Sequence, residues 1–311
     1  MKRLLPFLYL LSGCSIVLVD DRCDTATDPD TNDTGFAPEI MDFIDIDAGA
    51  THTCGILAEG TIRCWGNNDE GQLDAPSGQF ASLSVGHAHS CALDTEGAVS
   101  CWGRNDANQT ELFGTFTAVS AGGAHTCGLD QEGTVICAGQ NDQNQLNAPE
   151  HRFTSIAAGA THTCGIIKGD EDGSRSACWG SLSKEPEPGE AHEAVISGTD
   201  WSCVEAHGKE GRVTAACFGA SADGQHDVPD AVISGEWAAG ARHGCALNAA
   251  NEVVCWGAND ASQLDAPTGE FIQIASGPTS LHSCARARPI GDELASPVTC
   301  WGLDAENQLM P

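Results

Sequence analysis

The sequence predicts an all-β repeat protein with seven small units, and three observations support this fold class. Cysteine pairs recur seven times along the 311 residues, with the first cysteines of successive pairs 36 to 42 residues apart. Each pair lies between segments of alternating polar and apolar residues, which is typical of strands. A glycine-rich turn marks each boundary. Together these features favour a seven-bladed β-propeller with three-stranded blades over an open solenoid.

Composition divides the chain into three parts. Residues 1–14 have the pattern of a signal peptide that ends in a bacterial lipobox, residues 15–38 form an acidic linker, and residues 39–311 contain the seven repeats. Residues 20–38 of the linker contain six aspartates and almost no apolar residues, which predicts a disordered tether.

The first residues predict export. Lys2 and Arg3 precede a short apolar run, and the string Leu11-Ser12-Gly13-Cys14 resembles a lipobox, in which Cys14 would be lipidated. Apolar residues continue after Cys14, so an ordinary signal peptide or an uncleaved anchor over residues 4–19 remains the alternative. We expect a lipid-anchored protein at the bacterial outer membrane, on the cell surface or in the periplasm, with no other membrane segment.

Cys23 lies in the linker and has no partner in the repeats. It is a free thiol, forms an intermolecular bridge, or pairs with Cys14 if Cys14 is not lipidated.

The first repeat illustrates the elements of one blade. Residues 43–49 alternate and end in glycine, which predicts a first strand, and residues 52–57 and 61–66 predict the second and third strands. A tight turn lies between the second and third strands. Residues 67–76 form a polar connector to the next unit.

The register of the hairpin follows from the cysteines. If Cys54 faces Cys64, the residue after the centre of the turn is Gly60, at a position that requires a positive φ. The same count places Gly97, Gly133 and Asn251 there in three other units. Units four, five and seven have cysteine spacings of 14, 14 and 16 instead of 10. These even increases keep the cysteines opposite each other.

Opposed cysteines in an oxidising compartment predict one disulfide in each unit. The expected pairs are Cys54–Cys64, Cys91–Cys101, Cys127–Cys137, Cys164–Cys178, Cys203–Cys217, Cys245–Cys255 and Cys284–Cys300.

Metal binding is the competing interpretation of the same residues. A histidine precedes the first cysteine by two residues in six units, at His52, His89, His125, His162, His243 and His282. One histidine and two cysteines could bind a metal ion. However, unit five has Trp201 at the histidine position and retains both cysteines. We therefore favour structural disulfides, expect no metal or cofactor, and expect the histidines to satisfy backbone groups near the glycine turns.

The repeated string resembles the regulator of chromosome condensation repeat. In the first unit it comprises residues 48–57 followed by Gly60, Cys64-Trp65-Gly66, Asn68 and Gly71-Gln72-Leu73. The resemblance covers residues 40–311 and implies a seven-bladed β-propeller. The short repeats are closest to those of secreted bacterial members with three-stranded blades, such as the propeller-type β-lactamase inhibitor protein. The tryptophan is replaced by Ala138 and Phe218 in units three and five, and unit four lacks the Asn and Gln-Leu residues of the connector.

Two alternatives remain for how the ring closes. The first strand completes the last blade, or the two terminal blades pack against each other.

Charge excludes the activities of the nuclear family members. The chain has 14 basic and 44 acidic residues, for a net charge of −30, so we expect no nucleic-acid binding and no nucleotide exchange. The chemically reactive residues belong to the repeat, and no catalytic constellation occurs once only, so we expect no enzyme activity. The Asn-Asp strings of the connectors lack calcium-loop spacing, and turn formation explains them better.

The sequence therefore predicts a monomeric scaffold at the cell surface that binds an extracellular protein or glycan. An inhibitor of an extracellular enzyme is the alternative. The extended hairpins at residues 168–177, 205–216 and 286–299 are the candidate binding edge. Their basic residues are Lys168, Arg175, Lys209, Arg212, Arg286 and Arg288, and Trp201 is a candidate anchor near them.

Overall fold

The computed structural model describes residues 41–170, 173–182, 191–207, 213–232, 236–289 and 296–310. The chain divides into two units, Met1–Glu39 and Ile40–Pro311, and all described residues belong to the second unit. The predictions for the signal peptide, Cys14, Cys23 and the acidic linker therefore lie outside the described residues.

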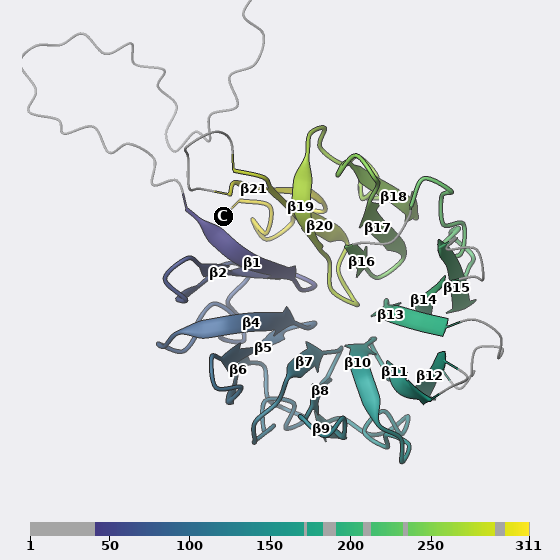
Figure 1. The fold of residues 1–311 in the computed structure, drawn as a ribbon. Helices are drawn as coiled ribbons and strands as arrows, with labels where there is room; N and C mark the ends of the chain where they lie inside the picture. Colours follow the sequence, from purple (N-terminus) through teal and green to yellow (C-terminus); the bar gives the residue numbers. More distant parts are fainter. Residues whose placement is uncertain are drawn as a thin grey trace, which may run out of the picture. The chain divides into compact units, whose positions relative to one another are not determined.

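The second unit is a ring of seven blades, each with three antiparallel strands in chain order (Figure 1). Blades one to three contain β1 (Phe43–Ala48), β2 (His52–Leu57), β3 (Ile62–Gly66), β4 (Phe80–Val85), β5 (His89–Asp94), β6 (Val99–Gly103), β7 (Ala118–Ala121), β8 (His125–Leu129) and β9 (Val135–Gly139). Blades four and five contain β10 (Phe153–Ala158), β11 (His162–Asp170), β12 (Gly173–Gly180), β13 (Ala191–Ser197), β14 (Trp201–His207) and β15 (Val213–Gly219). Blades six and seven contain β16 (Trp237–Ala239), β17 (His243–Leu247), β18 (Val253–Gly257), β19 (Phe271–Ala275), β20 (His282–Ala287) and β21 (Val298–Gly302).

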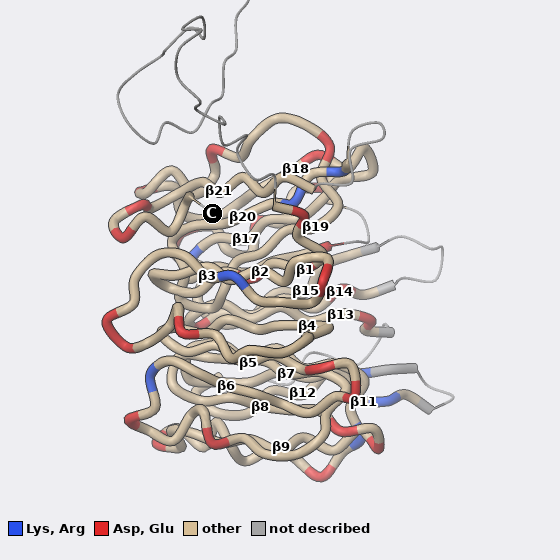
Figure 2. The backbone as a smooth tube through the Cα atoms, turned by 90° about the vertical axis from the view of Figure 1, so that its left-hand side faces the viewer, with Lys and Arg blue, Asp and Glu red and all other residues tan. Residues whose placement is uncertain are grey.

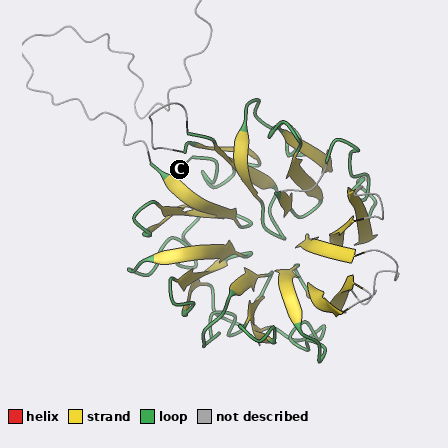
Figure 3. Cartoon of the chain, in the orientation of Figure 1, coloured by secondary structure: helices red, strands yellow, loops and turns green. Residues whose placement is uncertain are grey.

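The described residues form strands and loops only (Figure 3). Among them, no helix has the length and apolar character that a membrane span requires.

The predicted hairpin register is confirmed in every blade. The two cysteines of each pair face each other across the second and third strands, including the pairs in the three extended hairpins. All seven form disulfides, with Cα–Cα distances of 4.0 to 4.1 Å. Gly60, Gly97 and Gly133 have φ values of 88°, 84° and 81°, and Asn251 has a φ of 61°. The even insertions thus lengthen the hairpins and leave the disulfides in place.

Apolar side chains fill the spaces between consecutive blades. Between blades one and two, for example, Ile56 packs with Phe80 and Trp102. The Trp102 indole Nε1–H donates to the carbonyl oxygen of Gln72 at 2.8 Å, and this carbonyl belongs to the preceding connector. This hydrogen bond joins the tryptophan of blade two to the connector that follows blade one.

Side-chain contacts between complete terminal blades close the ring. β1 and β21 each belong to the sheet of their own unit, so no strand is exchanged. Trp65 of blade one donates its Nε1–H to the carbonyl oxygen of Gln308 at 2.8 Å. Arg286 Nη1 of blade seven donates to the carbonyl oxygen of Phe43 at 3.2 Å. Of the two alternatives, packing of the terminal blades is the one the structure shows.

The ring has two different faces. The hairpin-tip face carries the turns between second and third strands, and a hydrogen bond from Phe80 N to Gly60 O joins one tip to the start of the next first strand. The connector face carries the corners between first and second strands together with the turns that follow the third strands, joined by the bond from Asn67 N to Thr51 O. Figure 2 shows the strands running between these faces.

Candidate interaction surface

The histidines of the repeat form hydrogen bonds between blades. Each Nε2 lies near the hydroxyl that precedes the first cysteine of the next blade. The pairs are His52–Ser90 (2.8 Å), His89–Thr126 (2.9 Å), His125–Thr163 (2.8 Å), His162–Ser202 (2.8 Å), His243–Ser283 (2.7 Å) and His282–Thr53 (2.8 Å). In blade five, Trp201 Nε1–H donates to Ala241 O at 3.0 Å. The seven contacts form a closed circle, which we call the inter-blade ring.

The inter-blade ring corrects the predicted partners of the histidines. Their structural role was expected, but we predicted backbone partners near the glycine turn of the same unit. The actual partner lies 37 to 40 residues away within the chain, and in the seventh blade 229 residues away. Thr53 Oγ1 donates its proton to Gln308 O at 3.2 Å. In its contact with His282 the same oxygen therefore accepts a hydrogen bond from Nε2–H.

Burial keeps these imidazoles neutral. Desolvation lowers the pKa of His52, His125 and His282 to about 3, with a further contribution from neighbouring histidines. It lowers the pKa of the histidines in blades two, four and six to about 4. A neutral imidazole retains one N–H donor, which suits a hydroxyl partner.

The glycine three residues before the histidine leaves room for the ring. A Cβ on Gly86 would lie 2.4 Å from the carbonyl oxygen of Gly122 and 2.7 Å from His89 Cε1. The contact with the backbone oxygen cannot be relieved by a side-chain rotation. This close packing explains the glycine of the repeated Gly-x-x-His string.

The histidine and cysteines of a blade do not form a metal site. Both sulfurs are in a disulfide, and the histidine Nε2 faces the next blade. Across the described residues, no group of three His, Cys, Asp or Glu side chains is arranged to hold a metal ion.

The Asn-Asp strings organise the connector turns. Asn68 Oδ1 accepts from Leu73 N at 2.8 Å, and Gln72 Oε1 accepts from Glu70 N at 2.7 Å. The same asparagine bond recurs in the connectors that begin after blades two, three and six. These oxygens are occupied by backbone donors, as expected for turns.

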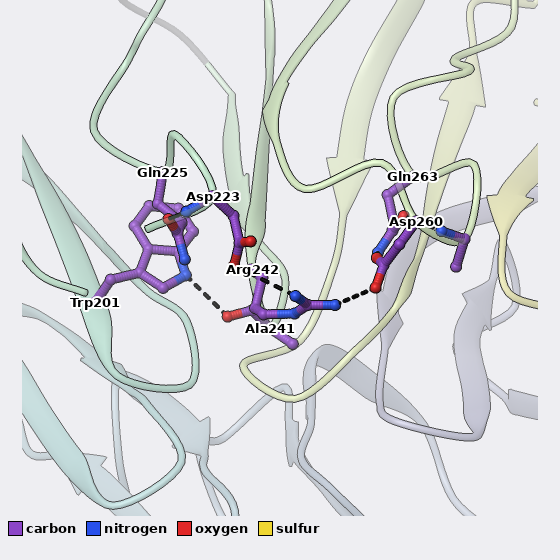
Figure 4. Close-up of polar contacts among 8 residues, drawn as sticks. Trp201, Asp223, Gln225, Ala241, Arg242, Asp260 and Gln263 are labelled. Atoms are coloured by element: carbon purple, nitrogen blue, oxygen red, sulfur yellow. Dashed lines mark hydrogen bonds and ion pairs between the residues drawn. The ribbon is translucent and has the colours of Figure 1, made fainter. Parts of the chain in front are cut away.

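Acidic side chains on the connector face bind nearby arginines. Figure 4 shows Arg242 between Asp223 and Asp260, with an Arg242 Nη1–Asp223 Oδ2 distance of 3.3 Å and a second ion pair from Nη2 to Asp260. Arg104 forms a similar ion pair with Asp106. The Arg242 pairs join a corner to two connector turns, whereas Arg104 and Asp106 lie two residues apart in one connector. Because these groups are exposed, the pairs add little to stability.

The predicted partner-binding residues have different environments. Lys168 and Arg175 are exposed on the extended hairpin of blade four. Arg288 is exposed on blade seven and lines a groove of about 490 Å³ with residues 267–271. Lys209 and Arg212 lie outside the described residues. These positions are compatible with the predicted binding edge at the hairpin tips.

Trp201 was wrongly predicted as an exposed anchor. Its side chain has 0% relative exposure and packs with Cys203 and Ala239 between blades five and six. It occupies the place of the histidine in the inter-blade ring, as Figure 4 shows. Arg286 is also engaged within the protein, because its Nε donates to Gln273 Oε1 at 3.0 Å beside the junction of blades seven and one.

First strands line the axial channel and are joined by side chains. Asp47 Oδ2 accepts from Val85 N of the next blade at 2.7 Å. In the following blades Ser84 Oγ accepts from Ala121 N at 3.0 Å, and Ser120 Oγ accepts from Ala158 N at 2.9 Å. The bonds satisfy N–H groups on the unpaired edges of the inner strands. Desolvation raises the pKa of Asp47 to about 7, whereas its backbone hydrogen bonds lower it.

A longer corner in blade seven crosses the axis on the connector face. The histidine follows the corner glycine by three residues in the other blades but by five in blade seven, from Gly277 to His282. Pro278 O accepts from Thr199 Oγ1 of blade five at 2.9 Å, and Thr279 Oγ1 lies 3.1 Å from His87 Nδ1 of blade two. Figure 1 shows this β19–β20 corner at the centre of the ring. The sequence analysis missed it, although the altered spacing was visible.

Seven blades with one disulfide each define a disulfide-linked β-propeller. Disulfides form and persist in oxidising compartments, so this is the domain of an exported protein. The family model described as "Regulator of chromosome condensation (RCC1) repeat" matches residues 43–72, 80–109, 116–145 and 238–263. Four of the seven units therefore match a repeat of the RCC1 type.

Solved structures with this fold include receptor ectodomains. The ectodomain of the Physcomitrella patens receptor kinase CR4 has 22% identity and a TM-score of 0.68, covering 84% of this chain and 73% of its own. The CRINKLY WD40 ectodomain of the Arabidopsis thaliana receptor kinase ACR4 has 25% identity and a TM-score of 0.67, covering 86% and 98%. Human WBSCR16 has 13% identity and a TM-score of 0.62, covering 76% and 85%. No curated protein matches the sequence.

Proposed function

We propose that the protein is a non-enzymatic scaffold, anchored at the cell surface, that binds an extracellular protein or glycan through its hairpin-tip face. The observation that carries the proposal is the extension of the hairpins in blades four, five and seven. The other blades join the same two strands with short turns. The fold therefore does not need the additional residues, and surface loops that the fold does not need are available for binding.

The use of the reactive side chains also supports a binding role. The repeat histidines are buried and bonded within the inter-blade ring, and the repeat cysteines are in disulfides. These groups are therefore not available as general bases or nucleophiles. Exposed Lys168 and Arg288 instead offer cationic groups at the hairpin-tip face of an otherwise acidic chain.

Anchoring at Cys14 is the second part of the proposal. A lipid at Cys14, followed by the acidic linker, would hold the propeller away from the membrane. The ectodomain relatives occur in receptor kinases, where a propeller lies outside the cell. The intact mass of the mature protein from its native host tests this part. An added diacylglycerol mass that disappears in Cys14→Ala supports it, and a mature chain that begins after residue 14 contradicts it.

Shortening the hairpins tests the binding face. Each of the three extended hairpins is replaced by the three-residue turn of blade one, and the variants are used with the parent to capture surface proteins and glycans from the native host. Because the disulfides lie below the tips, thermal unfolding should change little. Recovery of a specific partner should fall with at least one of the shortened hairpins.

Blade six provides the matched control, because its hairpin is already short and lies between two extended ones. Exchange of its turn for that of blade one should leave recovery unchanged. A partner that all three shortened variants recover as well as the parent does would refute binding through the tips.

A further inference from the structure

The axis of the propeller contains a cavity of about 160 Å³ beneath the crossing corner of blade seven. Pro278 and Gly277 of that corner line it on the connector face. The bonds from the corner to blades five and two hold this cover in place. The cavity is therefore a defined space with a cover supplied by one blade.

The walls of the cavity differ from one side to the other. Asp47, Ser84 and Ser120 line it from blades one, two and three. The equivalent positions of blades four to seven carry apolar side chains, namely Ala157, Ile196, Ala238 and Ala275. Ser197 and Ser276 also line the cavity, but their hydroxyls donate to the carbonyl oxygens of Ala157 and His282. Apolar surface with a few convergent polar groups is typical of small-molecule sites.

Polar groups at the cavity retain unused hydrogen-bonding capacity. Ser84 Oγ and Ser120 Oγ act as acceptors for backbone N–H groups, so each hydroxyl still has a proton to donate. Trp237 also belongs to the lining, but its indole ring packs between blades five and six, 5.8 Å from the ring of Trp256. The hydroxyls of Ser84 and Ser120 are half-buried, so water or a ligand in the cavity can accept their protons.

We propose that the axial cavity binds a compact polyhydroxylated ligand, of the size of a monosaccharide or a cyclic polyol. Hydroxyl groups both accept and donate, so they can accept the protons of Ser84 and Ser120 and donate to the remaining lone pairs of the Asp47 oxygens. The C–H face of such a ligand would pack against Ala157 and Ile196.

The chemistry of the walls argues against charged ligands. Among the described residues, no cationic side chain lines the cavity, so nothing there would neutralise an anion. A cation is also disfavoured, because both oxygens of Asp47 already accept backbone N–H groups, from Ala48 at 2.8 Å and from Val85 at 2.7 Å. The inference does not depend on the proposed function of the hairpin tips.

Titration of the full chain with D-glucose, D-galactose, N-acetylglucosamine and myo-inositol tests the inference. Saturation-transfer NMR reports the ligand, and intrinsic tryptophan fluorescence reports the protein. We expect saturable binding of at least one probe at millimolar or lower concentration.

Two variants locate the site. Ala157→Val adds methyl groups to the cavity wall and should weaken binding about tenfold or more without lowering the melting temperature. Ser120→Ala removes a hydroxyl from the cavity wall, at the position where blade four has Ala157, and should weaken binding about tenfold. Ala81→Val, at an exposed position of β4, is the matched control and should bind like the parent.

Two results would overturn the inference. In the first, none of the four probes binds saturably up to tens of millimolar, which would mean that the cavity holds only water. In the second, a probe binds the parent, Ala157→Val and Ser120→Ala equally, which would place its site elsewhere.

Discussion

Acidification from pH 8 to pH 5 should strongly destabilise the folded propeller through the inter-blade ring. Six histidines in the ring have folded-state pKa values of about 3 or 4, below the ordinary value of 6.5. The folded state therefore binds fewer protons than the unfolded state. The stabilisation is fully present above pH 6.5 and is lost as the pH falls through the interval between 6.5 and the folded-state values.

The size of the effect follows from these pKa values. At pH 5, a histidine that titrates near 6.5 when unfolded and near 4 when folded favours unfolding by about 2 kcal/mol relative to pH 8. Six such groups give about 12 kcal/mol, comparable with the whole stability of a typical domain. Asp47 acts in the opposite direction, because its pKa is raised to about 7 in the folded state. Protonation of Asp47 over the same pH interval stabilises the folded state by about 2–3 kcal/mol.

Denaturant unfolding at a series of pH values, with the disulfides intact, measures this dependence. Near pH 5.5, unfolding should take up about four to five protons, because the six histidines bind protons when they unfold and Asp47 releases one. His125→Gln keeps a neutral N–H donor in the ring and should reduce proton uptake by about one. Equal stability at pH 8 and pH 5, or unchanged proton uptake in His125→Gln, would refute the reasoning.

Three further predictions concern stability at neutral pH, each checked by denaturant unfolding. Replacing Cys91 and Cys101 together by alanine should cost about 2–4 kcal/mol, and a loss below 0.5 kcal/mol would contradict a stabilising disulfide. Gly86→Ala should cost about 2–4 kcal/mol because its Cβ would lie 2.4 Å from a backbone oxygen. Ala81→Gly, at an exposed position, is the control. If it lowers the free energy of unfolding as much as Gly86→Ala does, close packing at Gly86 does not explain the loss. Thr53→Val should cost about 1–3 kcal/mol, because it leaves the histidine of blade seven unpaired where the ring closes. A neutral result would show that closure does not depend on this hydroxyl.

Propeller geometry explains why the repeat residues are unavailable for chemistry. Small residues dominate the repeats, and only 5% of the chain is aromatic. Disulfides within blades and hydrogen bonds between blades therefore supplement a modest apolar core. Our proposals therefore assign binding to segments outside the repeat pattern, namely the extended hairpins and the long corner of blade seven. We expect variation among related proteins to concentrate there, which comparison of their sequences and binding partners can check.

Local features of the blades could be predicted from the sequence because they depend on short separations. The even cysteine spacings determine that Cys54 faces Cys64 and that the longer pairs remain opposed. Gly60 and Asn251 identify the turn, since few residues adopt a positive φ at low cost. Seven occurrences of one pattern made these local inferences mutually consistent. The same repetition indicated that the histidines and cysteines are structural.

Only the tertiary structure determined which residues of different blades meet. The partner of each repeat histidine lies in the next blade, so no inspection of one unit could identify it. Trp201 was proposed as a candidate anchor for a partner, yet its position within the repeat buries it between two blades. Closure by packing, the corner that crosses the axis and the cavity beneath it all depend on bringing the first and last units together. Residue spacing specifies contacts within a hairpin, whereas contacts around a ring depend on how all seven blades pack.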